Sequence, residues 1–449
     1  MINLLKVFQG FFNIFLHKTP HLDIFELENF VNEQLKKRKI FTRAYELYGS
    51  PIYFIEQQVL LDRAKKFIKV FNDSFSEPQI FYAIKSNNHP IIIKTLLNAG
   101  LGLDVSSGTE LELALNCGAT NIVLSGPGKT DKELKLVIQN QKYITVLMDS
   151  FSELERLNNL ALKAGVSIIA GVRITTDERA LWNKFGIPLN YLPDFFYKAE
   201  NYKNIHLNGI QFHTSWNLTP EKYVIFLKRL GRILKKVDKD NLDKIKFIDI
   251  GGGYWPQQGE WLLFEGTLEG KFYSSLIQST KRVISHYKFN AVPIEEFANQ
   301  IAKALEKHIY PLVKCKIYTE PGRWLCNDAM HIIVRVIDKK RKDMVITDAG
   351  TNAIGWERFE TDYFPVINLS RPGLKEHKCY ILGSLCTPHD IWGYSYHGKD
   401  IQIGDILLIP CQGAYTYSLR QEFIKPLPKV LYYTSNGEFK EYSNNNSNI

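Results

Sequence analysis

Short apolar runs alternate with longer amphipathic stretches through the middle of the chain. Runs rich in β-branched and aromatic residues predict eight strands, at 80–84, 102–105, 121–124, 145–148, 167–172, 207–212, 246–250 and 316–318. Between most of them, helical periodicity predicts helices at 90–99, 109–117, 131–139, 153–164, 218–237 and 294–308. This alternation indicates an α/β fold, and eight β/α units over about 250 residues fit a (β/α)8 TIM-like barrel.

The pattern changes after the eighth run. Short β-like runs without intervening helices follow at 332–336, 344–347, 379–382, 406–410 and 430–434. They predict a C-terminal all-β domain, sandwich-like or barrel-like. We therefore expect a segment 1–55 that packs in part with the β domain, a barrel at 56–325, the β domain at 326–442 and a disordered tail at 443–449.

Composition excludes several classes of protein. With 45% hydrophobic and 23% charged residues among 449, the chain is an ordinary globular protein, and no apolar run has the length of a membrane span. The six cysteines are far apart with no Cys-x-x-Cys pair, which predicts no metal site, no disulfide scaffold and a cytoplasmic location. The net charge of +9 is spread along the chain, so we expect no nucleic-acid partner.

Two segments have alternative interpretations. The basic run 36–39 is typical of a solvated helix face, and nucleic-acid binding is the alternative. The apolar stretch 7–16 lacks a signal-peptide cleavage site, which favours a docking helix over attachment to a membrane surface.

Chemically active residues follow the predicted strands. These are Lys85, Asp104, Arg173, His213, Gly251, Gly252, Gly253, Glu320, Gly322 and Arg323. In a barrel such positions converge on the C-terminal mouth, where catalysis takes place. Each has a simpler explanation: a surface lysine, a flexible glycine turn, a core histidine, or an ion pair between Glu320 and Arg323. Together, an amine, an imidazole, a carboxylate and a glycine-rich anion site are the groups that pyridoxal phosphate requires.

At this point the sequence resembles a known family. Five motifs match, in order, those of the fold-type III pyridoxal-phosphate decarboxylases, a group that includes diaminopimelate, ornithine and arginine decarboxylases. The motifs are Tyr82-Ala83-Ile84-Lys85, Gly251-Gly252-Gly253, Glu320-Pro321-Gly322-Arg323, Cys386-Thr387-Pro388-His389-Asp390 and Gly413-Ala414-Tyr415. Residues 104–111 and Lys184-Phe185-Gly186 are most similar to the diaminopimelate branch.

The resemblance implies a role for each matching residue. Lys85 would form the Schiff base with the cofactor, His213 would stack on its ring, and Glu320 would pair with its pyridine nitrogen. The glycines and Tyr415 would hold the phosphate, and Arg323 would bind substrate or phosphate. Cys386 and Asp390 would enter the site from a partner subunit. The active unit would then be a homodimer with shared sites, in which Cys386 is the proton donor and Asp390 contacts the amino-acid substrate.

Three departures bear on the substrate. Thr387 stands where diaminopimelate decarboxylases usually carry a glutamate for the distal amine. In His213-Thr214-Ser215-Trp216 the usual phosphate-binding serine is displaced, which makes Ser215 the candidate. The family's Arg-Pro-x-Leu-Tyr motif is missing, and Arg358 is the candidate replacement. The residues that would contact the distal end of the substrate differ, whereas the residues of the reaction centre are kept. This indicates the same reaction on an amino acid with a different side chain.

Three alternatives to a diaminopimelate-like decarboxylase remain. The first is a decarboxylase of D-ornithine, D-lysine or a siderophore or antibiotic precursor. The second is an amino-acid racemase, against which Glu320 argues. The third is a non-catalytic regulator, and the presence of Lys85 and Cys386 argues against it.

Overall fold

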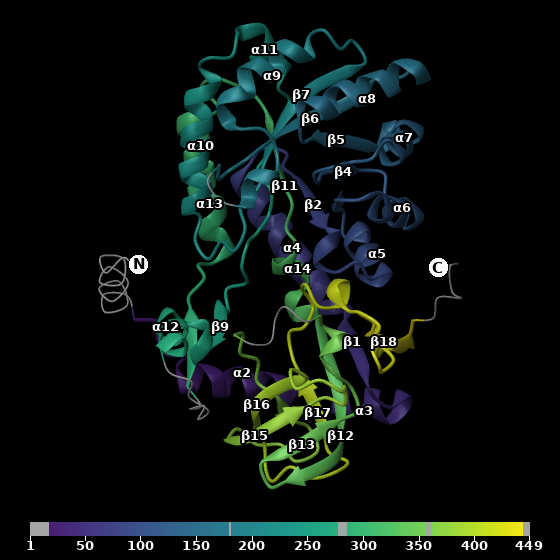
Figure 1. Ribbon diagram of the computed structural model, residues 1–449, viewed down its shortest axis with the longest axis vertical. Coiled ribbons are helices and arrows are strands. Elements are labelled where there is room, and N and C mark those ends of the chain that lie inside the picture. The colour runs from purple at the N-terminus through teal and green to yellow at the C-terminus, as the bar shows by residue number, and fades with distance from the viewer. Residues whose placement is uncertain (1–17, 179–180, 277–284, 356–360, 443–449) are drawn as a thin grey trace. The chain divides into compact units, whose positions relative to one another are not determined.

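The computed structural model describes residues 18–178, 181–276, 285–355 and 361–442 (Figure 1). The predictions for 7–16, Arg358 and 443–449 lie outside these residues. The described residues form two compact units. Of these described residues, the barrel unit takes those within Val59–Gln257 and Ala291–Cys326, and the β unit takes those within Met1–Gln58, Gln258–Asn290 and Asn327–Ile449.

The barrel unit contains a closed barrel of eight parallel strands, as the alternating pattern predicted. Each strand overlaps one of the predicted runs. Around the barrel the strands follow the order β11 (Lys316–Thr319), β2 (Gln79–Ala83), β3 (Gly102–Val105), β4 (Ile122–Leu124), β5 (Ile144–Met148), β6 (Ile168–Ile174), β7 (Ile205–Phe212) and β8 (Phe247–Asp249).

Helices connect successive strands of the barrel, while α4 precedes its first strand in the chain and α14 follows its last (Figure 1). Local sequence signals define their ends: Thr130 and Glu133 form a capping box on α7, and Gly165 ends α8 in the left-handed conformation. The helices are α4 (Gln57–Ser74), α5 (Pro90–Asn98), α6 (Gly108–Asn116), α7 (Asp131–Gln139), α8 (Phe151–Ala164), α9 (Leu192–Ala199), α10 (Glu221–Leu234), α11 (Lys239–Lys244), α13 (Ile294–His308) and α14 (Arg323–Cys326).

Large side chains fill the N-terminal half of the barrel interior. Phe81, Val123, Leu147 and Phe247 form one buried cluster, against which Tyr318 packs with its ring 4.4 Å from that of Phe247. The neighbouring strand β7 leaves room for this stack, because a Cβ at Gly209 would lie 2.1 Å from the Phe247 ring. The barrel is therefore closed at this level by packed rings.

The β unit is built on a nine-stranded sheet. Strand β13 pairs with both β15 and β12, so six of the strands close on themselves, while β1, β18 and β19 extend from β12. In order the strands are β13 (Met344–Thr347), β15 (Glu376–Leu382), β16 (Ile391–His397), β14 (Ile367–Asn368), β17 (Ile406–Ile409), β12 (Met330–Arg341), β1 (Ile52–Glu56), β18 (Lys429–Tyr433) and β19 (Phe439–Glu441). Strands β1, β14, β16 and β19 were not predicted from the sequence.

The β unit also includes helices and an inserted hairpin. Helices α2 (Ile24–Lys36) and α3 (Arg38–Tyr48) contribute Leu27, Val31 and Phe41 to its core. The hairpin β9 (Glu260–Leu263) and β10 (His286–Phe289) and helix α12 (Leu268–Leu276) lie in Gln258–Asn290. We had included this segment in the barrel domain 56–325, but its contacts are with the β unit, where Trp261 packs against Tyr363.

Among the described helices, none combines the length and apolar composition that crossing a membrane requires.

We predict that Gly209→Ala destabilises the barrel, because the added Cβ would overlap the Phe247 ring. The free energy of unfolding, measured by chemical denaturation, should fall by about 1–3 kcal/mol. The exposed His206→Ala on the same strand is the control and should change it by less than about 0.5 kcal/mol. Adding Phe247→Leu to Gly209→Ala should recover part of the loss, and a loss unaffected by Phe247→Leu would show that the ring contact is not the cause.

Candidate active site

Polar side chains line the barrel interior at its C-terminal end. Side chains on a strand alternate between its two faces, so the residue two positions after each inward ring or glycine also faces inward. By this alternation Tyr318 is followed by Glu320, Phe247 by Asp249, Gly209 by Gln211 and Gly102 by Asp104. All four polar side chains are buried.

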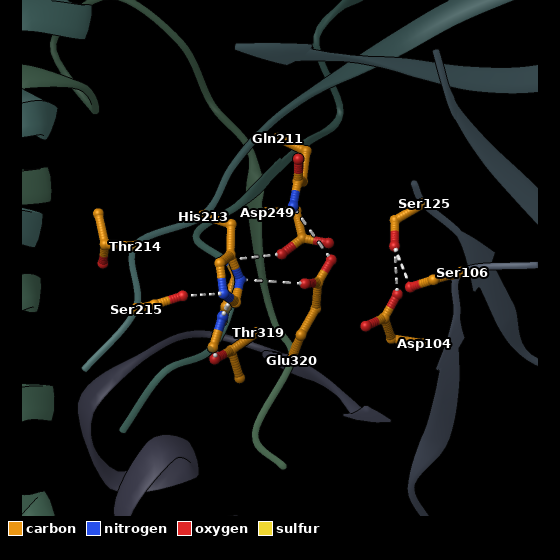
Figure 2. Close-up of polar contacts among 12 residues, drawn as sticks. Asp104, Ser106, Ser125, Gln211, His213, Thr214, Ser215, Asp249, Thr319 and Glu320 are labelled. Carbon is orange, nitrogen blue, oxygen red and sulfur yellow. Dashed lines mark hydrogen bonds and ion pairs between the residues drawn. The ribbon is translucent and has the colours of Figure 1, made fainter. Parts of the chain in front are cut away.

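Lys85 lies directly after β2 and pairs with Asp104 on β3. Its Nζ is 2.8 Å from Asp104 Oδ2, and the Ser125 hydroxyl donates to Oδ1 at 2.7 Å. Ser106 Oγ lies 3.2 Å from Ser125 Oγ (Figure 2). Burial and the nearby Glu320 carboxylate raise the pKa of Asp104, and Lys85 opposes this rise. About a third of the lysine side chain remains exposed, so the amine is held in place and accessible.

The imidazole of His213 is fixed at both nitrogens (Figure 2). The Gly252 N–H donates to Nδ1 at 3.1 Å, and Nε2 lies 3.1 Å from Ser215 Oγ. Burial lowers the pKa of His213. We therefore assign the neutral ring with its proton on Nε2, which donates to Ser215.

Glu320 is the central carboxylate of the mouth. It accepts a hydrogen bond from Gln211 Nε2 at 3.3 Å, and its Oε2 lies 3.6 Å from His213 Nδ1 (Figure 2). Burial raises the pKa of Glu320, but His213 and the Lys85 ammonium outweigh this effect and hold it at about 2. The buried glutamate is therefore ionised.

The residues Gly251, Gly252 and Gly253 make a close backbone crossing. A Cβ at Gly252 would lie 2.0 Å from the carbonyl oxygen of Glu320, and one at Gly253 would lie 2.2 Å from that of Thr214. Gly251 N–H donates to Asp249 and Gly252 N–H to His213. Two of the three amides that we expected to bind phosphate are therefore engaged within the barrel unit.

Gly322 precedes α14, and Arg323 is the first residue of this helix. The Arg323 guanidinium lies over the Trp255 ring, 4.4 Å from its centre. A Cβ at Gly322 would lie 2.9 Å from Ser86 Cβ, so glycine lets this turn approach the residue after Lys85.

The remaining predicted site residues are in the β unit. Cys386 is exposed, and Tyr415 has a positive φ of 57°. Asp390 is buried: it accepts the N–H groups of Thr351 and Leu385, each at 2.7 Å, and the Thr351 hydroxyl at 3.2 Å. Its carboxylate therefore fixes the loop that carries Cys386.

Gln211, Asp249 and Ser125 were not predicted from the sequence. Gln211 and Asp249 lie within strands β7 and β8, whereas we had considered residues that follow strands. Ser125 directly follows β4, whose end we had not considered. Counting back two positions from His213 reaches Gln211, so the period of two would have found it.

The family model for "Pyridoxal-dependent decarboxylase, pyridoxal binding domain" matches residues 61–327. The chain is 26% identical over 398 residues to the diaminopimelate decarboxylase of Aquifex aeolicus, covering 84% of this chain and 85% of that protein.

Solved structures share the fold. Diaminopimelate decarboxylase from Helicobacter pylori, complexed with L-lysine, aligns with a TM-score of 0.72 at 22% identity over 89% of this chain and 95% of that one. Lysine/ornithine decarboxylase from Vibrio vulnificus, complexed with putrescine, aligns with a TM-score of 0.69 at 19% identity over 88% and 98%.

We predict that Ser125→Ala destabilises the protein by about 2 kcal/mol at neutral pH, because a buried carboxylate loses a donor. The pKa of Asp104 is already raised, and losing Ser125 should raise it further. The cost exists while Asp104 is ionised and should shrink as the pH falls and the carboxyl takes up a proton. Unfolding measured across pH checks this.

Ser150→Ala is the matched control. It removes the hydroxyl that caps α8 by accepting the Glu153 N–H at 3.1 Å. It should cost about 1 kcal/mol, with little dependence on pH. An equally flat profile for Ser125→Ala would contradict our assignment of its effect to Asp104.

Proposed function

This chain belongs to the pyridoxal-dependent decarboxylases, and on that basis we propose that it removes the α-carboxyl group of a diamino or other basic amino acid, using Lys85, His213, Glu320 and Cys386. Pyridoxal phosphate is the cofactor of this family. The observation that carries the proposal is the ionised, buried Glu320 within the same barrel mouth as the accessible amine of Lys85.

The residues of the mouth fit this cofactor. An amine, a flat imidazole and an ionised carboxylate are all present, and side chains are missing from Gly251 to Gly253, where a Cβ would fill the space. Lys85 would hold the cofactor's carbonyl carbon and Glu320 its ring nitrogen. The Gly253 amide, Ser215 and Arg323 of this unit, with Tyr415, would hold the phosphate.

When bound, the cofactor supplies an electron sink that accepts the negative charge left at Cα as CO2 departs. Glu320 supports this chemistry because its negative charge keeps a proton on the facing ring nitrogen. Desolvation strengthens that interaction, since Glu320 is 2% exposed. Asp104 keeps the amine of Lys85 directed into the mouth through the contact of 2.8 Å.

His213 orients the cofactor ring from one face. Its imidazole is held by the Gly252 amide and by Ser215, so it presents a fixed flat surface. Because the ring is neutral, it adds no positive charge that would compete with the ring nitrogen for Glu320.

Cys386 is the proposed proton donor to Cα, delivered from the second subunit of a homodimer. Its exposure in a single chain supports this role, because a partner can reach an exposed thiol. Asp390 would serve this site mainly by shaping the loop, since three hydrogen bonds already occupy its carboxylate.

The substrate is proposed from the relatives and from one departure. Relatives named diaminopimelate decarboxylase and neighbours named lysine/ornithine decarboxylase indicate an amino acid with a second, distal amine. Thr387 replaces the glutamate usual for diaminopimelate, which favours a diamino acid with a different distal end, D-ornithine or D-lysine among them.

We predict CO2 release from at least one member of a panel of meso-diaminopimelate and both enantiomers of lysine, ornithine and arginine. The purified, cofactor-loaded protein is assayed for CO2 and for the amine product. Norleucine, which lacks the distal amine, is the matched control and should be at least about 100-fold poorer by kcat/KM. Turnover of norleucine equal to that of the best diamino acid would contradict the substrate class, and racemisation without CO2 would contradict the reaction.

We predict that Lys85→Ala and Cys386→Ala are each nearly inactive alone and that mixing them restores activity. If one site takes Lys85 from one subunit and Cys386 from the other, a hybrid dimer contains one intact site. Random mixing should then recover about a quarter of wild-type activity. The control mixes the Lys85→Ala single variant with a double variant that carries both Lys85→Ala and Cys386→Ala. This mixture contains no intact site and should stay inactive. No recovery in dimers shown to exchange subunits would contradict the shared site.

A further inference from the structure

Asp249 lies beside Glu320 at the end of β8, and its role is not explained by the roles assigned above. Its side chain is fully buried. Oδ1 accepts the Gly251 N–H at 2.8 Å, whereas Oδ2 has no hydrogen-bond partner among the described residues. Figure 2 shows the carboxyl groups of Asp249 and Glu320 next to each other. Two adjacent buried carboxylates would repel each other strongly in this dry environment.

The surroundings supply too few donors for two charges. Gln211 donates through Nε2 to Glu320, while its own Oε1 is a buried acceptor without a partner in the described chain. His213 Nδ1 accepts the Gly252 N–H at 3.1 Å and lies 3.6 Å from Glu320 Oε2, so its contact with Glu320 is longer than a full hydrogen bond. A proton on Asp249 Oδ2 would turn an unsatisfied acceptor into a donor at the place where one is missing.

We propose that Asp249 is a positioning residue that carries a proton on Oδ2 and donates it in a hydrogen bond to Glu320, so that Glu320 alone holds the negative charge. This inference rests on the proposed role of Glu320 toward the cofactor's ring nitrogen. Asp249 would keep the glutamate ionised and correctly placed without itself touching substrate or cofactor.

The other titratable groups facing Asp249 agree with this assignment. Burial, followed by the charge of Glu320 and then that of Asp104, raises the pKa of Asp249 well above its ordinary value. Burial likewise raises the pKa of Tyr254 and Tyr318, so both phenols are neutral. The ammonium of Lys85 is paired with Asp104 at 2.8 Å.

Asp249 also links Glu320 to the glycine crossing. Its Oδ1 accepts the Gly251 N–H, and the carbonyl oxygen of Gly251 accepts the Glu320 N–H at 2.8 Å. Asp249 therefore supports the side chain of Glu320 directly and the backbone of Glu320 through Gly251. Moving Asp249 should disturb both ends of the cofactor together.

The test compares Asp249→Asn, Asp249→Ala and Glu320→Gln in the full-length protein. An amide reproduces a protonated carboxyl: its oxygen accepts from Gly251 and its N–H donates to Glu320. Asp249→Asn should therefore keep the dissociation constant of pyridoxal phosphate within about threefold, and Asp249→Ala should raise it about tenfold or more. In the Glu320→Gln variant, adding Asp249→Ala should raise the dissociation constant of pyridoxal phosphate by a much smaller factor than it does in the wild-type protein.

Infrared spectroscopy tests the proton directly. The wild-type spectrum should contain the C=O stretch of a protonated carboxyl group that Asp249→Asn removes. Asp238→Ala is the control for stability alone, because it removes a surface helix cap that accepts the Asn241 N–H at 2.9 Å. It should lower the melting temperature without changing cofactor affinity.

The outcomes separate the two proposals. If Asp249→Asn weakens cofactor binding as much as Asp249→Ala, or leaves the infrared band in place, Asp249 is not the protonated donor and this inference is wrong. If Glu320→Gln changes neither the visible absorbance of the bound cofactor nor its affinity, the proposed role of Glu320 itself fails.

Discussion

The period of two along parallel strands is the constraint on which the rest of the barrel depends. Every second residue of a strand faces the barrel interior. Once one residue of a strand faces inward, the residue two positions further along therefore faces inward as well. Gly209 makes room for the Phe247 ring, and two residues further along the same strands lie Gln211 and Asp249. The packed rings therefore close the barrel at its N-terminal end. The buried polar side chains lie two residues further along the same strands and form a polar layer towards the C-terminal end.

Charge is the second constraint, because the polar layer is buried. Asp104, Asp249 and Glu320 are three buried carboxyl groups that interact with one another, and the ammonium of Lys85 acts on Asp104 and Glu320. Each unpaired charge in such a place is costly. The arrangement limits this cost by pairing Asp104 with Lys85 and by giving the proposed proton to Asp249. One uncompensated charge remains, on Glu320, at the place where the proposed chemistry requires an anion.

Much of the barrel was predictable from sequence, because its signals are local. Apolar runs and helical periodicity identified all eight strands and the helices α5, α6, α7, α8, α10 and α13. Strands β1, β14, β16 and β19 were missed. β14 is only two residues long, and β16 alternates aromatic with small residues. The placement of Gln258–Asn290 depends on long-range packing, His286 on Glu376 for example, and no local pattern encodes it.

The same distinction applies to the candidate site and its substrate. Motifs identified Lys85, His213 and Glu320. The proposed role of Asp249 depends on its position beside the Glu320 carboxylate, which is seen only in the folded structure. In the β unit, Asp390 fixes the loop around Cys386 through backbone contacts to Leu385 and Thr351, none of which involves the side chain of residue 387. A change from glutamate to threonine there leaves these Asp390 contacts intact. The residue proposed to set substrate preference, Thr387, is therefore separate from the contacts that hold the loop of the proposed proton donor.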